Sequence, residues 1–305
     1  MDLMGHVARL YYLQGLTRVQ IAQRLGISRF KTARLLEAAL ETGLVTISLK
    51  PSALVNPEIS DALAARFGLR QAFAVRVDDI GDRAKPNPIQ EYLGRVAAGV
   101  LTETVTKDDV LGLDSGRTVS HIADYLTRLP PCDVVQLTGL AGTVQQTGLE
   151  IMGRIMSASG GNAYPIYAPM MAHDAASADA LRQQPGVQST MEHYRQVTKA
   201  VVSVGSWTPP ESQVYDRLSV AERDALLKSG VVAETCALMF DARGQALHGL
   251  DDRRIGISLG DLRAVPNVIG VAGGSSKRRA ISALLRAGIL HTLITDEPTA
   301  KALLA

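Results

Sequence analysis

Aromatic residues, cysteines and long apolar runs are all scarce in this sequence. Only 4% of the 305 residues are aromatic, and two are cysteines, Cys132 and Cys236. Both cysteines lie in apolar, strand-like runs without a metal-ligand spacing, which favours buried free thiols and indicates no metal site. No apolar run approaches the roughly 20 residues of a membrane span, and no signal-peptide pattern opens the chain. These absences predict a cytoplasmic protein without a membrane partner.

The net charge is also small, but it is unevenly distributed. The whole chain carries +2, whereas residues 1–50 carry +4, from seven Lys and Arg side chains against three acidic ones. Residues 51–305 therefore carry −2. A basic end of this kind is typical of a segment that contacts nucleic-acid phosphates. With 305 residues and 46% apolar content, the chain is long enough for two domains with packed cores.

The basic end contains a pattern of two short helices joined by a tight turn. Thr17 and Gln20 form a capping box that opens the first helix, and Gly26 ends it. Ser28 caps the second helix. The expected apolar stripe of the second helix consists of Ala33, Leu35, Leu36 and Leu40.

The second helix has the outline of a recognition helix, whose first residues enter the major groove of DNA. Arginine and lysine at such positions can reach guanine acceptors, and the helix N-terminus can lie near a phosphate. The candidate DNA-binding residues are Arg18, Ser28, Arg29, Lys31, Thr32 and Arg34. Two core helices of an ordinary α domain are the alternative, which the agreement of caps, turn and basic residues disfavours. The segment therefore predicts binding to double-stranded operator DNA.

Residues 1–50 are expected to form one compact winged unit. Apolar residues at helical spacing upstream, Val7, Leu10, Tyr11 and Leu13, supply a first helix, and Val45, Ile47 and Leu49 alternate as a wing strand would. Prolines and polar residues at 51–57 indicate a linker. A second domain is expected to cover residues 58–305. One copy has few basic side chains, so we expect a homo-oligomer, a dimer or tetramer, on a repeated operator.

Short apolar strands alternate with amphipathic helices through the second domain. Strands are expected at 72–77, 110–113, 134–137, 163–167, 200–204, 236–240, 268–271 and 292–294. Helices are expected at 89–105, 118–129, 148–158, 220–228 and 277–287. This order predicts an α/β fold with a parallel sheet covered on both faces, a Rossmann-like layering.

Ligands of such sheets bind beyond the carboxyl ends of the strands, where four loops here carry polar or glycine-rich groups. The loops lie at 114–118, 138–143, 205–206 and 270–277. One such loop is weak evidence, because tight turns use Gly and Ser for conformational reasons. Convergence of several loops at one edge, with Arg117 and Lys277 nearby, indicates a site for a phosphate or an oxygen-rich sugar. Glu234 could accept sugar hydroxyls there or be a surface carboxylate.

Three segments together resemble the SorC family of bacterial sugar-responsive transcriptional regulators. They are IAQRLGISRFKTARLLEAALETGLVTI, GLDSGRTV and VIGVAGGSSKRRAISALLRAGILHTLITDEPTAKALL, and the similarity covers nearly the whole chain. The resemblance implies an effector domain similar to the glucosamine-6-phosphate deaminase and ribose-5-phosphate isomerase fold. It also implies a homo-oligomer on DNA, often a tetramer, and a carbohydrate effector, commonly phosphorylated.

The resemblance also implies which residues contact the effector. These effector-binding candidates are Asp114, Ser115, Gly116, Arg117, Thr118, Thr138, Gly139, Thr143, Glu234 and Lys277. Asp114 departs from the family, which has an aromatic or small polar residue at this position. A carboxylate beside an anion site repels phosphate, so a free sugar or polyol is an alternative to a sugar phosphate.

Two other classes of function compete with a ligand-controlled regulator. A sugar-phosphate isomerase or deaminase with a DNA-binding arm would need a poised base, for which Asp114, Glu234 and Asp296 are the possible carboxylates. None has an obvious His or Lys partner in sequence, so we expect no catalytic residue and no cofactor. The second competitor is a large domain that serves only as an oligomerisation scaffold, against which the glycine-rich loops argue.

Overall fold

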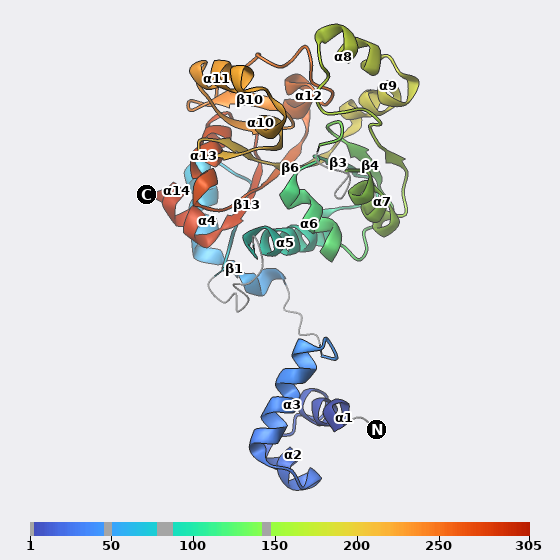
Figure 1. The fold of residues 1–305 in the computed structure, drawn as a ribbon, viewed down its shortest axis with the longest axis vertical. Helices are drawn as coiled ribbons and strands as arrows, with labels where there is room; N and C mark the ends of the chain where they lie inside the picture. The colour runs from blue at the N-terminus through green and yellow to red at the C-terminus, as the bar shows by residue number, and fades with distance from the viewer. Residues whose placement is uncertain (1–2, 46–50, 78–87, 142–147) are drawn as a thin grey trace. The chain divides into compact units, whose positions relative to one another are not determined.

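The computed structural model describes residues 3–45, 51–77, 88–141 and 148–305. The chain divides into two compact units, Met1–Lys50 and Pro51–Ala305 (Figure 1). Each unit has its own apolar core and is described by itself.

The described part of the small unit consists of three helices around an apolar centre. They are α1 (Leu3–Tyr12), α2 (Arg18–Leu25) and α3 (Arg29–Glu41). Val7, Leu10, Ile21 and Leu36 form the buried centre, one or two residues from each helix.

Hydrogen bonds at the helix ends of the small unit agree with the expected helix boundaries. The capping box between Thr17 and Gln20 opens α2, and Gly26 ends it in the left-handed conformation with a φ of 64°. The Ser28 side chain accepts a hydrogen bond from the Lys31 amide at the start of α3. The predicted pair of helices and the turn between them are therefore confirmed.

The predicted orientation of α3 is wrong in two places. Thr32 is fully buried, and its hydroxyl donates to the Ser28 carbonyl at 3.2 Å, whereas Leu40 is 41% exposed. The side chains that face the centre are Thr32, Leu36 and Ala39, because their spacing of four and three residues follows one helix face. Small residues on the inner side left the direction of the buried face ambiguous in the sequence.

Two further expectations for the small unit concern its edges. Leu13 lies beyond the end of α1 and is 79% exposed, so it does not belong to the centre. Of the expected wing strand, Val45 follows Gly43 in a bend, and residues 46–50 lie outside the described residues.

The large unit is built on a mostly parallel sheet, which confirms the predicted α/β class. Among the described residues this sheet has eight strands in the order β1-β2-β13-β12-β6-β3-β4-β5, and each neighbouring pair is parallel except β1 with β2. The strands are β1 (Val55–Asn56), β2 (Gln71–Val75), β3 (Val110–Leu113), β4 (Asp133–Gln136), β5 (Ala163–Tyr164), β6 (Lys199–Ser203), β12 (Asn267–Val271) and β13 (Thr292–Asp296).

Successive residues of the central strands enter two different cores, which explains their uninterrupted apolar sequences. In β6, Val201 belongs to one core, whereas Ala200 and Val202 belong to the other. The first core includes residues of α5 (Pro88–Thr104), α6 (Arg117–Tyr125) and α7 (Gly148–Ser159). The second includes residues of α4 (Pro57–Phe67), α8 (Ala175–Arg182), α9 (Pro185–Glu192), α12 (Leu259–Ala264), α13 (Arg278–Arg286) and α14 (Glu297–Leu304).

A second, antiparallel sheet was not expected from the sequence. Its strands among the described residues are β7 (Gly205–Trp207), β8 (Pro210–Glu211), β9 (Val231–Thr235), β10 (Leu238–Asp241) and β11 (Ala246–Leu247). The short helix α10 (Gln213–Arg217) and α11 (Val220–Lys228) follow β8, and both contribute to the core with β7 and β9.

The strand expected at 236–240 begins two residues late, because Cys236 and Ala237 form the turn of a hairpin. Their φ angles are 50° and 57°, and Leu238 pairs with Thr235 across the turn. Two-residue hairpin turns with positive φ usually contain Gly, Asn or Asp. The Cys-Ala pair therefore concealed both the turn and the strand β9 before it.

The expected linker at 51–57 lies within the large unit. Residues Pro51–Leu54 form a 3₁₀ turn, and β1 pairs antiparallel with β2. Leu54 is 8% exposed, and the Asn56 side chain accepts a hydrogen bond from the Ile59 amide at the start of α4. The segment resembles a linker in sequence because it contains two prolines and because its strand has only two residues, too few to show a pattern. In the structure the segment is nevertheless packed.

Cys132 and Cys236 are both buried free cysteines, as expected. In the described ranges, no group of three or more His, Cys, Asp and Glu side chains is placed to hold a metal ion. None of the described helices combines the length and the apolar content that crossing a membrane requires.

Candidate effector pocket and nucleic-acid interface

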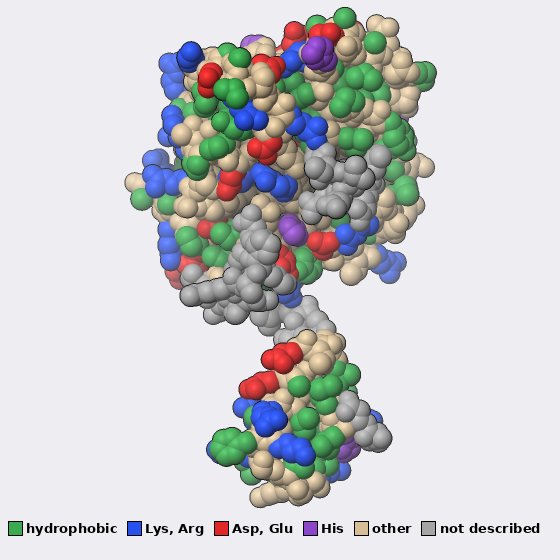
Figure 2. All heavy atoms as spheres, in the orientation of Figure 1, with side chains coloured by type: hydrophobic (Ala, Val, Ile, Leu, Met, Phe, Trp, Pro, Cys, Tyr) green, Lys and Arg blue, Asp and Glu red, His purple; other side chains and the backbone are tan. Residues whose placement is uncertain are grey.

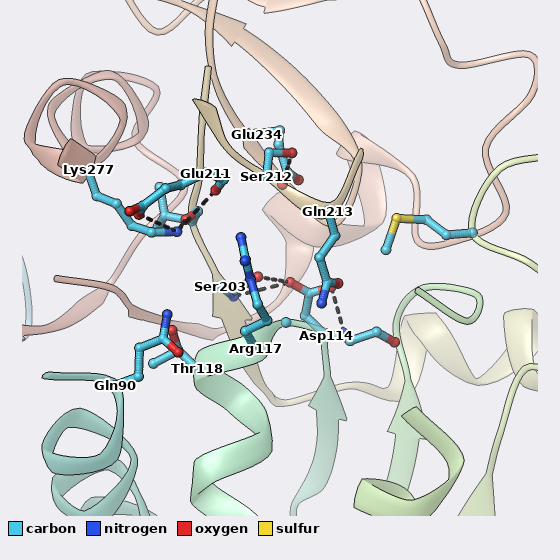
Figure 3. Close-up of a pocket in the computed structure, with 15 residues that line it drawn as sticks. Gln90, Asp114, Arg117, Thr118, Ser203, Glu211, Ser212, Gln213, Glu234 and Lys277 are labelled. Atoms are coloured by element: carbon cyan, nitrogen blue, oxygen red, sulfur yellow. Dashed lines mark hydrogen bonds and ion pairs between the residues drawn. The ribbon is translucent and has the colours of Figure 1, made fainter. Parts of the chain in front are cut away.

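The carboxyl ends of β3, β6 and β12 meet at a cavity of about 400 Å³, part of it open to solvent (Figure 3). The predicted residues that line it are Asp114, Ser115, Gly116, Arg117, Thr118, Glu234 and Lys277. Sequence reasoning missed the further lining residues Gln90, Met170, Ser203, Val204, Glu211, Ser212 and Gln213. Thr143 lies outside the described residues.

Asp114 holds three strand ends together. One carboxylate oxygen, Oδ1, accepts from the Ser115 amide at 2.8 Å and from the Thr138 hydroxyl at 3.0 Å. The other, Oδ2, accepts from the Ser203 hydroxyl at 2.6 Å and the Ser203 amide at 3.2 Å. Since Asp114 is 5% exposed, these donors replace water around a buried charge.

Thr138 and Gly139 lie behind the cavity wall instead of lining it. Thr138 is fully buried and supports Asp114. At Gly139 an added Cβ would lie 2.5 Å from the Pro169 carbonyl oxygen, so the backbone needs glycine there. In this structure Thr138 supports Asp114, and Gly139 allows the close approach of the Pro169 backbone.

The start of α6 presents cationic and hydrogen-bonding groups to the cavity. Gly116 caps this helix without a side chain, and a Cβ there would lie 2.2 Å from the Ser203 side chain. Arg117 is exposed, and its side chain makes no ion pair or hydrogen bond with a described residue. Figure 3 shows its side chain extending into the space between Glu211 and Gln213. An unpaired guanidinium beside free helix amides suits an anionic group.

Lys277 approaches the same cavity from the loop after β12. Its Nζ donates to the carbonyl oxygens of Val204 at 2.5 Å and Glu211 at 3.3 Å. Burial lowers the pKa of Lys277, whereas the carboxylates of Glu211 and Glu234 raise it. The ammonium group is thus fixed in position by two backbone carbonyls rather than by a close ion pair.

Glu234 occupies the opposite side of the cavity, in β9. Its Oε1 accepts a hydrogen bond from the Ser212 hydroxyl at 2.9 Å, and its side chain is buried. Burial and the nearby Asp114 charge raise the pKa of Glu234 to about 7, against the lowering effects of Ser212 and Lys277. Glu234 can therefore accept or donate a hydrogen bond near neutral pH, depending on its proton.

The cavity has two chemically different sides. Arg117, Lys277 and the start of α6 form a cationic side, with Gln90 beside Thr118, and Glu234 and Ser212 lie at the other end of the cavity, where groups suited to hydroxyls are found (Figure 3). This arrangement can bind a small, oxygen-rich molecule.

On the small unit, the N-terminal part of α3 is basic on its outward face. Arg29, Lys31 and Arg34 are exposed, as is Arg18 at the start of α2. Figure 2 shows Lys and Arg side chains gathered on the face of this unit turned to the viewer. Ser28 is used as the helix cap, and the buried Thr32 has no access to a ligand, which removes it from the candidates. Sequence reasoning passed over Phe30, which is 74% exposed on this face.

Comparisons with known proteins identify the class. The chain is 28% identical over 311 residues to the transcriptional regulator LsrR of Klebsiella pneumoniae subsp. pneumoniae, covering 100% of this chain and 93% of LsrR. It is 29% identical over 304 residues to the erythritol catabolism regulatory protein EryD of Brucella abortus, covering 97% and 94%. The full-length sorbitol operon regulator SorC from Klebsiella pneumoniae has the same fold, with a TM-score of 0.79, 22% identity and coverage of 99% and 98%. The chain is a transcriptional regulator.

The family of the chain is shown by a match to the large unit. A family model described as "Putative sugar-binding domain" matches residues 54–305, and the chain belongs to this family. The match includes the residues that line the cavity. The predicted resemblance to SorC-type regulators is thereby confirmed.

Proposed function

We propose that the small unit binds double-stranded operator DNA and that a carbohydrate bound in the large unit changes the operator affinity. The observation that carries this proposal is the convergence of Asp114–Thr118, Glu234 and Lys277 on one polar cavity. The effector is a sugar, a sugar phosphate or a polyol, in keeping with relatives that are named for erythritol catabolism and a sorbitol operon. The controlled genes then belong to carbohydrate or polyol catabolism.

The geometry supports a phosphorylated effector over a free polyol. The repulsion expected from Asp114 is reduced, because both of its oxygens already accept hydrogen bonds from Ser115, Thr138 and Ser203. Arg117 has no ion pair with a described residue and is free to bind a dianion. The phosphate would bind at Arg117 and the first turn of α6, and the hydroxyl groups would face Glu234.

The test is a thermal-shift screen of matched pairs, each a sugar or polyol and its phosphate ester. A ligand that binds the folded state alone raises the unfolding midpoint, by about 2.7 kcal/mol of stability at 100 times its Kd. The best ligand should also change the affinity for operator DNA in a mobility-shift titration. No shift with any member of the panel would favour the scaffold alternative.

Replacing Arg117 by alanine is expected to weaken binding of the phosphorylated ligand and to spare its unphosphorylated partner. Loss of a charge-assisted hydrogen bond predicts a roughly 10- to 100-fold increase in the Kd of the phosphate ester. Isothermal titration with both members of the pair measures the difference. Arg128→Ala is the control, since Arg128 is an exposed arginine outside the cavity. Equal loss for both ligands would assign Arg117 to the sugar moiety.

We further propose that operator binding requires a homo-oligomer, a dimer or tetramer. The small unit offers few basic side chains, so that one copy neutralises few phosphates and binds weakly at physiological salt. The effector would act by changing how the large units pair and thereby the spacing of the DNA-binding units. A wing following α3 and a Rossmann-like, sugar-phosphate-isomerase-type large domain complete the proposed architecture, in a cytoplasmic protein.

Arg34→Ala and Arg29→Ala test the DNA end. A side chain that contacts a base should weaken binding to the operator more than binding to nonspecific DNA, by about 1 to 3 kcal/mol for a good contact. Mobility-shift titrations on both DNAs at one fixed salt concentration give the comparison. An equal loss on the two DNAs would mean that the arginine contacts phosphate.

We propose binding without catalysis in the large unit. Two of the three carboxylates that an isomerase could use are engaged in support of the fold, since Asp114 accepts four hydrogen bonds and Asp296 accepts from the Gly274 and Thr299 amides. The third, Glu234, lines the cavity and accepts a hydrogen bond from Ser212. The relatives LsrR and EryD are named as regulators. Incubation with ribose 5-phosphate and glucosamine 6-phosphate checks this directly, because turnover would revive the isomerase or deaminase alternative.

A further inference from the structure

Phe30 is an apolar side chain that lies outside the core formed by the described residues of the small unit. It is the second residue of α3, and its side chain is 74% exposed. The inner face of α3 is marked by Thr32, Leu36 and Ala39. With 3.6 residues per turn, Phe30 and Arg34 project from the opposite side, one turn apart. The ring therefore projects outward from the first turn of α3, on the side opposite the buried face of this helix.

The surroundings of the ring are cationic. The Arg29 guanidinium carbon lies 5.6 Å from the centre of the Phe30 ring, and Lys31 and Arg34 are exposed beside it. The first turn of α3 contains no acidic residue. A purely apolar protein surface placed here would bury these positive charges without partners, which is unfavourable. A matching surface has to combine negative charge with a small apolar group.

The major groove of DNA provides this combination. Phosphates line its edges, and each thymine exposes a C5-methyl group on its floor, to which phenylalanine can make apolar contact. We infer that Phe30 contacts a thymine methyl group in the operator and so determines sequence specificity at that base pair. This inference rests on the proposed operator binding and adds to it a residue that recognises a base without hydrogen bonds.

The experiment removes the methyl group instead of the base pair. A duplex that the full-length protein binds tightly is selected from random-sequence DNA, and each thymine is then replaced singly by deoxyuridine. Loss of one buried methyl group predicts an about four-fold increase in Kd at the contacted thymine. In Phe30→Ala the selected duplex should bind more weakly, and the same deoxyuridine replacement should have no effect. Fluorescence anisotropy at one salt concentration measures the four Kd values, which are those of the parent and of Phe30→Ala for the selected duplex and for its deoxyuridine form.

Leu13→Ala is the matched control. Leu13 is an apolar side chain of the same unit, 79% exposed and outside α3, and its removal should leave the four-fold thymine effect unchanged. Since Phe30 is exposed, Phe30→Ala should keep the thermal midpoint and the oligomer size of the parent. Circular dichroism and light scattering verify both.

The other outcomes separate two kinds of failure. If selection yields no duplex preferred over random DNA, the proposed operator binding itself is wrong. If a preferred duplex exists but every deoxyuridine effect is the same in Phe30→Ala and the parent, Phe30 does not read a methyl group. A change in oligomer size on Phe30→Ala would assign the ring to contact with a second copy of the chain and overturn the inference.

Discussion

Asp114→Ala is expected to destabilise the large unit by about 3 kcal/mol, because it leaves buried donors without an acceptor. The carboxylate accepts hydrogen bonds from Ser115, Thr138 and Ser203, and it joins the ends of β3, β4 and β6. Chemical denaturation followed by circular dichroism would show a lower midpoint of unfolding. Water that enters from the open cavity can accept hydrogen bonds from some of these donors. The expected destabilisation is therefore smaller than the sum over all the hydrogen bonds that are lost.

Asp114→Asn and Asp114→Ala together separate two roles of Asp114, support of the loops and contact with the ligand. The amide keeps the size of the side chain and one acceptor oxygen, and we expect an intermediate loss of stability. If Asp114→Ala instead keeps the midpoint of the parent and abolishes the thermal shift by the effector, Asp114 is a ligand contact and not a support of the loops. The sequence suggested contact with the ligand, since Asp114 is a carboxylate in the loop that carries the expected anion site.

The convergence of the loops was predictable, because it depends on topology alone. Parallel strands place their carboxyl ends at one edge, so Asp114, Arg117 and Lys277 had to approach each other once the alternating pattern was recognised. Glu234 was also proposed, although its strand was not.

The side of the cavity formed by the second sheet was not predictable in the same way. Glu211 ends a strand of two residues, and Ser212 and Gln213 follow it; such a strand is too short to show an alternating pattern. The hairpin turn at Cys236 and Ala237 lacks the usual glycine or asparagine. Ser203 could have been proposed, since it is the polar residue of the strand expected at 200–204, two residues before the glycine that begins another loop.

In the small unit, sequence reasoning found the helices but misjudged the faces of α3. Thr32 is buried, although a hydroxyl beside basic residues suggested contact with DNA. Phe30 was not among the DNA-binding candidates, although its side chain is exposed beside them. Rotation of a helix by a few tens of degrees exchanges such positions, and only packing against α1 and α2 fixes it.

Replacement of Glu234 by glutamine is expected to stabilise the protein at alkaline pH. Burial and the Asp114 charge raise the pKa of Glu234 to about 7 in the folded state, above the ordinary value of 4.5. The folded state thus holds the proton more tightly than the unfolded state. The stability that this contributes is complete below pH 4.5 and is lost as the pH rises to 7. Above pH 7 the ionised, buried carboxylate is unfavourable by about 3 kcal/mol.

Glutamine cannot ionise, but it keeps an oxygen that accepts from Ser212. The difference in free energy of unfolding between Glu234→Gln and the parent should therefore grow from pH 4.5 to pH 8. At pH 8 the midpoint of thermal unfolding should rise by roughly 5 to 10 °C, from the usual relation between stability and midpoint for a unit of this size. A difference that is the same at pH 5 and pH 8 would show that Glu234 does not titrate between these values.

Glu222→Gln provides a control of opposite sign. Hydrogen bonds from Ser219 lower the pKa of Glu222 to about 2, with Arg253 adding to the effect against weak desolvation. The ionised form stabilises the folded state above the ordinary pKa, and this stability is lost as the pH falls toward 2. Glu222→Gln should therefore lower the midpoint at pH 8, where Glu234→Gln raises it.

The cause assigned to the Glu234 shift can be tested in the same assay. The Asp114 charge is the second contribution to that shift after burial, so Asp114→Asn should lower the pKa of Glu234. The stabilisation by Glu234→Gln at pH 8 should then be smaller in the Asp114→Asn background than in the parent, a coupling that a double-mutant cycle measures. In the proposed binding mode the effector hydroxyl groups face Glu234 and its phosphate lies in the same cavity, so an anionic effector should raise the pKa of Glu234 further. Effector binding would then take up a proton near neutral pH, and Glu234→Gln would abolish that uptake.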